Sequence, residues 1–232
     1  MRRSAMIIAP LLCALTLAPL SALAAGQPAG KKNLLKQADT AIATLRWGDA
    51  AALLKKLIAT APSWQAYQKL GHAEFNLAQY QDAIAAFGAA ADLARAQGDT
   101  PELRLAIAEI LTEQGNVHLR MRDYDGAFAS YRAALPFAEK YPVAYFNVCA
   151  LDYTQGRSET ALADCNAAIK ADPSNADAYF IKGALLFAST TLTAEGKMVA
   201  PPEAVDALNM YLQLQPSGSH AKDVHYMLDS LN

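Results

Sequence analysis

Four histidines are the first residues to examine for chemistry, because imidazole is a common metal ligand and general base. His220 and His225 are five residues apart, so they do not share one helix face as the i,i+4 ligand pair of a zinc protease does. The chain also lacks the HExxH, GxSxG, Walker A and GxGxxG signatures of catalytic or phosphate-binding sites. The histidines and motifs therefore indicate neither a catalytic metal nor a nucleotide site.

The carboxylates and cysteines lead to a similar expectation. Asp82, Asp125 and Asp164 fall on predicted polar faces, where solvated side chains are favoured over catalytic ones. Cys149 and Cys165 lack the second pair of ligands that a structural zinc site needs. We therefore predict no catalytic residue, no metal and no cofactor, and a protein that is not an enzyme.

These residues must be positioned by helices, and the clearest helical pattern lies between residues 64 and 93. Its first half places bulky and small residues three or four apart: Tyr67, Leu70, Gly71 and Phe75. Its second half repeats that spacing: Ala83, Phe87 and Ala90. Small residues let two helices approach closely while large ones fill the gaps beside them, so a helical hairpin is predicted. The pattern resembles the tetratricopeptide repeat, a hairpin of about 34 residues.

Copies of this pattern recur along most of the chain. An alanine marks the start of each predicted second helix: Ala50, Ala83, Ala127, Ala161 and Ala204. Another set of residues follows four positions later: Leu54, Phe87, Tyr131, Cys165 and Leu208. Prolines at one common offset end three of the second helices: Pro62, Pro173 and Pro216. Repeats are predicted at about residues 31–63, 64–100, 101–141, 142–175 and 176–218.

The resemblance implies an all-α fold, a right-handed α-solenoid of about five helix pairs with no sheet. Residues 220–231 carry apolar side chains at helical spacing and are predicted to form a capping helix over the last pair. Residues 189–202, rich in Thr and Pro, replace the turn of the fifth pair. We expect a solvated loop there, with a flap that contacts a partner as the alternative.

The N-terminal segment has the features of an export signal. Arg2 and Arg3 precede an almost wholly apolar run, and a small-x-small cleavage site ends at Ala24. Residues 1–24 are therefore predicted to be a signal peptide cleaved near Ala24, with an uncleaved anchor as the alternative, and residues 25–30 a flexible linker. The expected location is periplasmic or extracellular, without membrane insertion after cleavage.

Composition and charge narrow the class of partner. Hydrophobic residues make up 53% of the chain and charged residues only 18%, so disorder is not indicated. The net charge is −2, and it becomes −4 when Arg2 and Arg3 are removed with the signal. A mildly acidic chain without runs of basic residues disfavours nucleic acid or anionic lipid as the main partner.

The family resemblance implies a function as well as a fold. It indicates a non-enzymatic scaffold or adaptor that binds a peptide or a partner protein in a concave groove, here in the cell envelope. The alternative is a small-ligand receptor with a pocket inside the superhelix. An enzyme would need convergent titratable groups, which the predicted groove offers sparsely.

The resemblance assigns the groove to one face of the first helices. The residues at those offsets are Gln68, His72, Phe75, Asn76, Thr112, Asn116, Arg120, Phe146 and Tyr153. Helical spacing alone indicates only that they share a face, and Phe75, Phe146 and Tyr153 could instead fill contacts between adjacent hairpins. Amides and aromatic rings suit an extended peptide, whereas a nearly isolated Arg120 disfavours recognition of a terminal carboxylate.

Cys149 and Cys165 are predicted to lie level with each other in the fourth hairpin. The midpoint between them falls at Arg157, in the predicted turn. Helix axes about 8–10 Å apart leave facing Cα atoms roughly 4–5 Å apart, at the near edge of disulfide range. The compartment that the signal implies is oxidising, so we expect a possible disulfide, with two buried thiols as the alternative.

Overall fold

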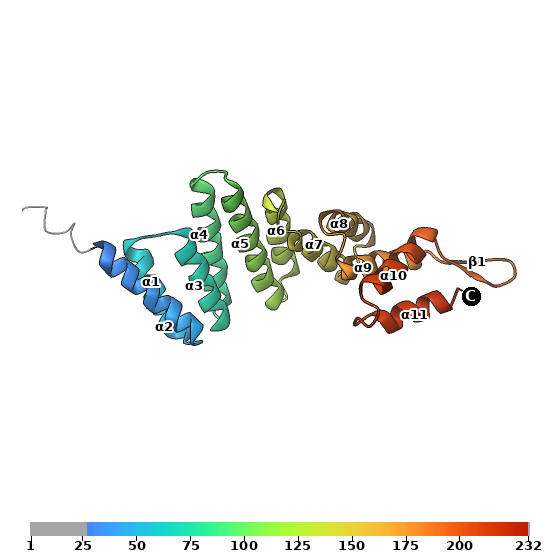
Figure 1. Ribbon diagram of the computed structural model, residues 1–232, viewed down its shortest axis with the longest axis horizontal. Coiled ribbons are helices and arrows are strands. Elements are labelled where there is room, and N and C mark those ends of the chain that lie inside the picture. Colours follow the sequence, from blue (N-terminus) through green and yellow to red (C-terminus); the bar gives the residue numbers. More distant parts are fainter. Residues whose placement is uncertain (1–26, 232) are drawn as a thin grey trace, which may run out of the picture.

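The structure, a computed structural model, describes residues 27–231 (Figure 1). In this range eleven α-helices follow one another as an elongated stack, with α1 at one end and α11 near the other. The predicted signal peptide, residues 1–24, lies outside the described residues. The prediction of a flexible linker over residues 25–30 was wrong for residues 27–30, because helix α1 already begins at Gln27.

Ten of these helices form five consecutive pairs. The first two pairs are α1 (Gln27–Ala43) with α2 (Trp47–Thr60) and α3 (Trp64–Asn76) with α4 (Tyr80–Ala96). The next two are α5 (Pro101–Arg120) with α6 (Tyr124–Ala134) and α7 (Val143–Thr154) with α8 (Ser158–Ala171). The fifth is α9 (Ala176–Phe187) with α10 (Pro202–Leu214), and α11 (Ala221–Asp229) follows. A short 3-10 turn, η2 (Leu135–Phe137), extends α6. The prediction of an α-solenoid with five pairs and a capping helix is confirmed.

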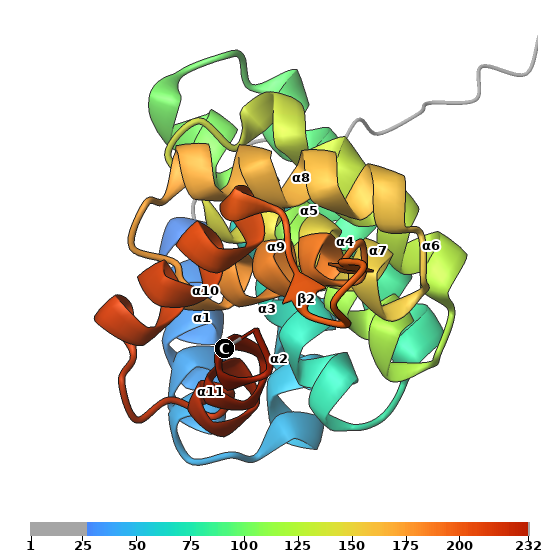
Figure 2. The same cartoon turned by 90° about the vertical axis from the view of Figure 1, so that its right-hand side faces the viewer.

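The view along the stack shows that the pairs turn around the long axis rather than forming a flat row (Figure 2). Each first helix packs against its own second helix, and from the second pair onward it also packs against the second helix of the preceding pair, as the contacts of α3 with α2 and of α5 with α4 show. A single pair cannot bury its apolar residues alone, so stacking creates the continuous core of such an array.

In four of the five pairs, the same tight turn joins the first helix to the second. One residue in each turn has a positive φ, between 56° and 71°, and lies two residues before the second helix begins: Leu45, Ala78, Arg122 and Gly156. This left-handed conformation is comfortable for glycine and strained for other residues. Three hairpins therefore reverse direction with a residue that disfavours the required backbone conformation.

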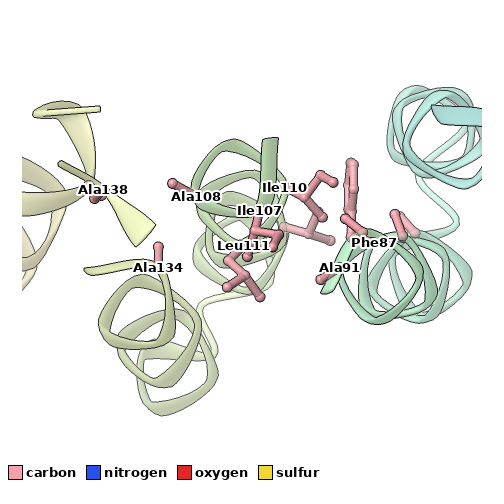
Figure 3. Close-up of a cluster of buried hydrophobic side chains, with 13 residues drawn as sticks. Phe87, Ala91, Ile107, Ala108, Ile110, Leu111, Ala134 and Ala138 are labelled. Atoms are coloured by element: carbon pink, nitrogen blue, oxygen red, sulfur yellow. The ribbon is translucent and has the colours of Figure 1, made fainter. Parts of the chain in front are cut away.

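The alanines predicted to open the second helices lie in the core. All five are fully buried: Ala50, Ala83, Ala127, Ala161 and Ala204. The residues four positions later are buried as well: Leu54, Phe87, Tyr131, Cys165 and Leu208. Between pairs, Ile107 and Ile110 of α5 extend toward Phe87 and Ala91 of α4 (Figure 3). The repeat register read from the sequence is therefore the packing register of the fold.

The insertion in the fifth pair corrects the prediction that the chain has no sheet. Two short antiparallel strands, β1 (Thr191–Leu192) and β2 (Met198–Val199), form a hairpin between α9 and α10. This hairpin projects from the stack near its C-terminal end (Figure 1). Leu192 and Val199 remain exposed, so the segment is a solvated hairpin rather than an irregular loop.

Helix α11 closes part of the last pair. It buries Ala221 and Val224 in a cluster with Leu208 and Tyr211 of α10. The residue before the helix, His220, stacks on Phe180 of α9 with ring centroids 3.9 Å apart. These contacts fix α11 against the fifth pair, as a capping helix requires.

Candidate functional site

The first helices α3 and α5 are linked by Glu113, on one side of the stack. Glu113 Oε1 lies 3.0 Å from His72 Nε2, and Glu113 Oε2 accepts a hydrogen bond from Gln68 Nε2 at 3.2 Å. The structure thus brings two predicted groove residues together through a glutamate that the prediction missed. The groove residues were predicted from fixed offsets along one face of each first helix. Glu113 follows Thr112 directly and does not fall at one of these offsets, so the prediction missed it. The i,i+4 spacing of Glu109 and Glu113 is the signal that could have found it.

A shallow pocket of about 250 Å³ lies beside this link. Three of the predicted groove residues line it: His72, Phe75 and Asn116. Its other walls are Glu113, Phe87 and Val117. The floor is therefore apolar and the rim carries an imidazole, an amide and a carboxylate, which is a suitable environment for one side chain of a bound peptide.

Asn116 is held in place by a tyrosine from the second helix of its own pair. Tyr131 donates a hydrogen bond from its hydroxyl to Asn116 Oδ1 at 2.7 Å. Burial raises the pKa of Tyr131 to about 12, so this hydroxyl keeps its proton and remains a donor. The Asn116 amide group is thereby oriented with its nitrogen free of this contact.

Thr112 does not belong on the accessible face where the prediction placed it. Its side chain is only 2% exposed, and its hydroxyl oxygen has no hydrogen-bond partner among the described residues. The offset rule failed here because helical spacing gives the direction of a residue and not what the neighbouring pair places over it. Thr112 is therefore removed from the candidate site.

The remaining predicted residues differ in how accessible they are. Asn76 and Arg120 are exposed at the ends of α3 and α5, and Asn76 donates a hydrogen bond to the His72 carbonyl oxygen at 2.8 Å. Phe146 packs against the cluster around Cys149, which fits the alternative that it fills a contact. Tyr153 on α7 remains 37% exposed.

A row of large apolar residues crosses the whole stack. Each first helix carries one in its last turn or close to it: Ile42, Phe75, Leu119, Tyr153 and Phe187. Leu119 is 41% exposed and Tyr153 37%, while the other three are half-buried. We call these five residues the apolar row. They occupy one position of the repeat, so the row follows from the repeat itself, although the prediction had named only part of it.

Two carboxylates shape the charge beside the pocket. Burial raises the pKa of Glu109, and the negative charge of Glu113 raises it further. The pKa of Tyr141 is raised by burial and by the same two carboxylates. The middle of this face is therefore acidic, whereas Arg120 adds a positive charge at the end of α5.

The cysteine pair lies behind this face, between α7 and α8. The Cα atoms of Cys149 and Cys165 are 4.8 Å apart, within the range predicted from the helix spacing, and the structure joins their sulfurs in a disulfide. Both residues are fully buried. Their geometry excludes a role for either sulfur on the accessible face.

Asp164 corrects the expectation of a solvated carboxylate. Its side chain is only 14% exposed and lies 2.6 Å from Arg132 Nη2. Asp152, fully buried on α7, accepts a hydrogen bond from Arg157 Nε at 2.7 Å. Both guanidinium groups lie over the ring of Phe128, at 4.9 and 4.5 Å. This cluster fastens the third pair to the fourth.

The described residues hold no group of three or more His, Cys, Asp or Glu side chains placed to bind a metal ion. Among residues 27–231, no helix has the length and apolar character needed to cross a membrane.

Comparison with known proteins identifies the repeat. The profile of the family described as tetratricopeptide repeat matches residues 68–142 and 151–219, which together are more than half of the chain. The chain belongs to the tetratricopeptide repeat family.

Curated and solved tetratricopeptide proteins agree with this assignment. The small glutamine-rich tetratricopeptide repeat-containing protein 2 of Mycosarcoma maydis is 30% identical over 118 residues, 51% of this chain and 31% of that protein. The match therefore spans about a third of the relative's length. The crystal structure of YrrB, described as a TPR protein with an unusual peptide-binding site, has a TM-score of 0.57 at 19% identity, covering 82% of this chain and 88% of YrrB.

Two MamA structures are similar as well. One has a TM-score of 0.62 at 18% identity, covering 83% of this chain and 94% of that chain. MamA 41-end from Desulfovibrio magneticus RS-1 has a TM-score of 0.59 at 16% identity, covering 82% and 97%. At these identities the likeness establishes the shared fold.

The tetratricopeptide register also accounts for the polar groups inside the stack. One position of the first helix carries a polar side chain in three successive repeats: Glu74, His118 and Asp152. Their partners lie 2.9, 2.7 and 2.7 Å away, respectively: Lys55 Nζ, Asp123 Oδ2 and Arg157 Nε. Glu74, His118 and Asp152 are paired with other side chains of this protein, so we assign them a role in holding the stack together and not in binding a partner.

Proposed function

We propose that this protein is a non-enzymatic scaffold of the cell envelope that binds an extended segment of a partner protein across its first helices. The apolar row carries this proposal. Leu119 and Tyr153 keep more than a third of their surface in solvent, although the repeat buries the large residues at its packing positions. Exposed apolar surface bordered by polar groups is typical of interaction sites.

The groups around the row suit an extended chain. Gln68 and Asn116 supply amides and His72 an imidazole, which can pair with backbone groups that leave water on binding. The pocket of about 250 Å³ beside them accepts one side chain of the segment. The proposal therefore places the partner's backbone along the amides and its side chains on the row.

Two substitutions test whether the row binds the partner. Leu119→Asp and Tyr153→Asp place a charge on exposed surface, so folding should be little affected while recovery of the partner falls at least tenfold. The matched control is Tyr226→Asp, on α11, where the tyrosine is 77% exposed and belongs to none of the first helices that carry the row. Affinity capture from the exported fraction, with mass spectrometry, measures recovery. Equal recovery by all three variants and the native chain would reject the row as the binding surface.

Charge at the end of α5 is tested separately. Asn116→Ala is an ambiguous probe, because it removes the acceptor of the buried Tyr131 hydroxyl. Arg120→Ala is cleaner, since Arg120 is exposed and no ion pair of its own is found among the described residues. Reduced partner recovery by Arg120→Ala with an unchanged melting temperature supports a contact at this end of the row.

Export is part of the proposal and has its own test. The apolar run and the small-x-small site before Ala25 support cleavage by a signal peptidase. N-terminal sequencing of the protein recovered from a periplasmic or extracellular fraction should begin at or near Ala25. Recovery only from the cytoplasm, with Met1 or Arg2 at the N-terminus, contradicts the envelope location.

A further inference from the structure

Two carboxylates lie one helical turn apart on α5, beside the apolar row. Glu113 is in the wall of the pocket of about 250 Å³ and reaches across to α3. Glu109 stands four residues before it, so both project from the same side of the helix. Burial raises the pKa of Glu109, and the negative charge of Glu113 raises it further. Like charges at this spacing destabilise a helix, so the pair is unfavourable in the free chain.

The contacts of the two carboxylates include no lysine or arginine. Glu113 lies 3.0 Å from His72 Nε2 and accepts a hydrogen bond from Gln68 Nε2 at 3.2 Å. These contacts hold its carboxylate at the rim of the pocket. Among residues 27–231, the Glu109 carboxylate takes part in no ion pair and no hydrogen bond with another side chain, although it is half-buried.

The lysine and the arginines of α3 and α5 are engaged elsewhere or stand apart from this pair. Lys69 pairs with Asp39 at 2.6 Å, and Arg104 pairs with Asp99 at 3.0 Å. Arg120 is at the other end of α5, about 10 Å from the second carboxylate along the helix axis. The two carboxylates therefore lack a cationic partner from these helices, on the face that the partner's segment is proposed to cross.

The pocket beside Glu113 suits the stem of a basic side chain. Phe75, Phe87 and Val117 supply apolar surface, and Glu113 and Asn116 supply polar atoms. Lysine and arginine bury their methylene groups against apolar surface while they keep the charged group among polar atoms. A carboxylate at the edge of an apolar wall fits such a side chain, whereas it repels an acidic one.

We propose that the segment bound across the first helices carries a lysine or an arginine, whose stem enters this pocket and whose cation pairs with Glu113 and lies beside Glu109. The inference rests on the proposed peptide-binding function and adds the kind of residue that the site selects. Charge complementarity carries it, because the cation neutralises two carboxylates that repel each other in the free chain. Complementary charge of this kind contributes mainly to the choice between partners.

Peptide pools test this selectivity. The probes are labelled peptides of about ten residues, N-acetylated and C-amidated so that they carry no terminal charge. One central position is fixed as lysine, arginine, norleucine or glutamate, and the other positions are drawn from uncharged residues. The chain without residues 1–24 should bind the lysine and arginine pools at least about fivefold more tightly than the norleucine pool in low salt, and the glutamate pool least. The preference should shrink in high salt, because screening weakens the ion pair.

Substitution of the carboxylates locates the preference. Glu113→Gln should reduce it and the double variant Glu109→Gln with Glu113→Gln should abolish it, while the norleucine pool binds as it does to the native chain. Glu109→Gln alone removes a charge that has no partner, so it should fold even if the loss of the Glu113 contacts destabilises the other variants, and it should also reduce the preference. The control Glu159→Gln removes one charge from the exposed surface of α8 and should keep the preference. A preference that survives in the double variant, or that the control loses as well, overturns the proposal.

The same pools distinguish a failure of this inference from a failure of the proposed function. Equal binding of the lysine, arginine and norleucine pools, weakened for all of them by Leu119→Asp, means that the row binds peptides without selecting a basic residue. That result overturns the inference and leaves the proposed function in place. If no pool binds the native chain, the peptide-binding function and this inference are both rejected.

Discussion

A Cβ atom added at Gly71 would lie 2.8 Å from Cε1 of the Phe87 ring. Gly71 is on α3 and Phe87 on α4, so the absence of a side chain at one position makes room for the ring at the other. Similar contacts hold Tyr131 against Gly115 and Leu208 against Gly183. This relationship sets how closely the two helices of a pair approach.

Enlarging a residue at such an approach should destabilise the fold. Ala83 on α4 is fully buried, so Ala83→Leu must displace its neighbours and should lower the free energy of unfolding by about 1–3 kcal/mol. Ala85→Leu, on the exposed side of the same helix, is the control and should change it by less than about 0.5 kcal/mol. Urea titration followed by circular dichroism measures both. Equal stability of the two variants would contradict the close packing at Ala83.

The hairpin turns predict a stabilising substitution. Ala78 has a φ of 58° between α3 and α4, a conformation in which a side chain is strained. Ala78→Gly removes that strain, so we expect the free energy of unfolding to rise by about 0.5–1 kcal/mol, less the entropy that glycine loses on folding. Gly156→Ala, at the equivalent turn with a φ of 71°, should lower it by about 1 kcal/mol. A loss of stability in Ala78→Gly would show that the strain is not released.

Much of the fold could be predicted from the sequence, because it repeats. Each of the five opening alanines is a weak signal alone, yet all five are fully buried at the same place in their helix pairs. The prediction that Cys149 and Cys165 face each other also followed from the repeat, because the position of the tight turn fixes which residues of the two helices lie opposite each other. The hairpin of β1 and β2 did not follow, because it is an insertion that belongs to no repeat.

The candidate site was less predictable for a physical reason. The offset rule gives the direction of a side chain on its own helix and does not include the neighbouring pair. It therefore placed Thr112 on the accessible face, where another part of the protein covers it, and missed Glu113, which reaches across to α3. Asp164 was expected in solvent for the same reason, because Arg132 and Asp152 come from other helices.

The disulfide between Cys149 and Cys165 predicts a redox-dependent stability. The bond closes a loop with a sequence separation of 16, so it should contribute about 3 kcal/mol, mainly by restricting the unfolded chain. Reduction should lower the free energy of unfolding of the native chain by that amount. It should leave the free energy of unfolding of the double variant, Cys149→Ala with Cys165→Ala, unchanged. Labelling of the unfolded, unreduced protein without residues 1–24 should find no free thiol. Two free thiols per chain would contradict the bond.

The paired carboxylates Asp152 and Asp164 predict how stability depends on pH. Burial and the adjacent Asp152 raise the pKa of Asp164 to about 6, although Arg132 lowers it. An unfolded aspartate titrates near 4, so between about pH 4 and 6 the folded protein holds a proton at Asp164 that the unfolded chain has released. The stability from this group is therefore fully present below about pH 4 and is lost as the pH rises through about 6.

Asp164→Asn tests this dependence, because asparagine resembles the protonated aspartate and cannot ionise. The free energy of unfolding of the variant should fall less between pH 4 and 6 than that of the native chain. At pH 7.5 it should exceed the native value by up to about 3 kcal/mol, because a shift of about two pKa units corresponds to about 1.4 kcal/mol per unit. This gain already allows for the lost ion pair with Arg132, since its attraction is included in the pKa of about 6. Asp125→Asn, at an exposed aspartate on α6, is the control and should leave the profile unchanged. Urea titrations at half-unit pH steps measure all three chains, and a steeper fall in Asp164→Asn than in the native chain would show that Asp164 is charged in the folded protein throughout this range.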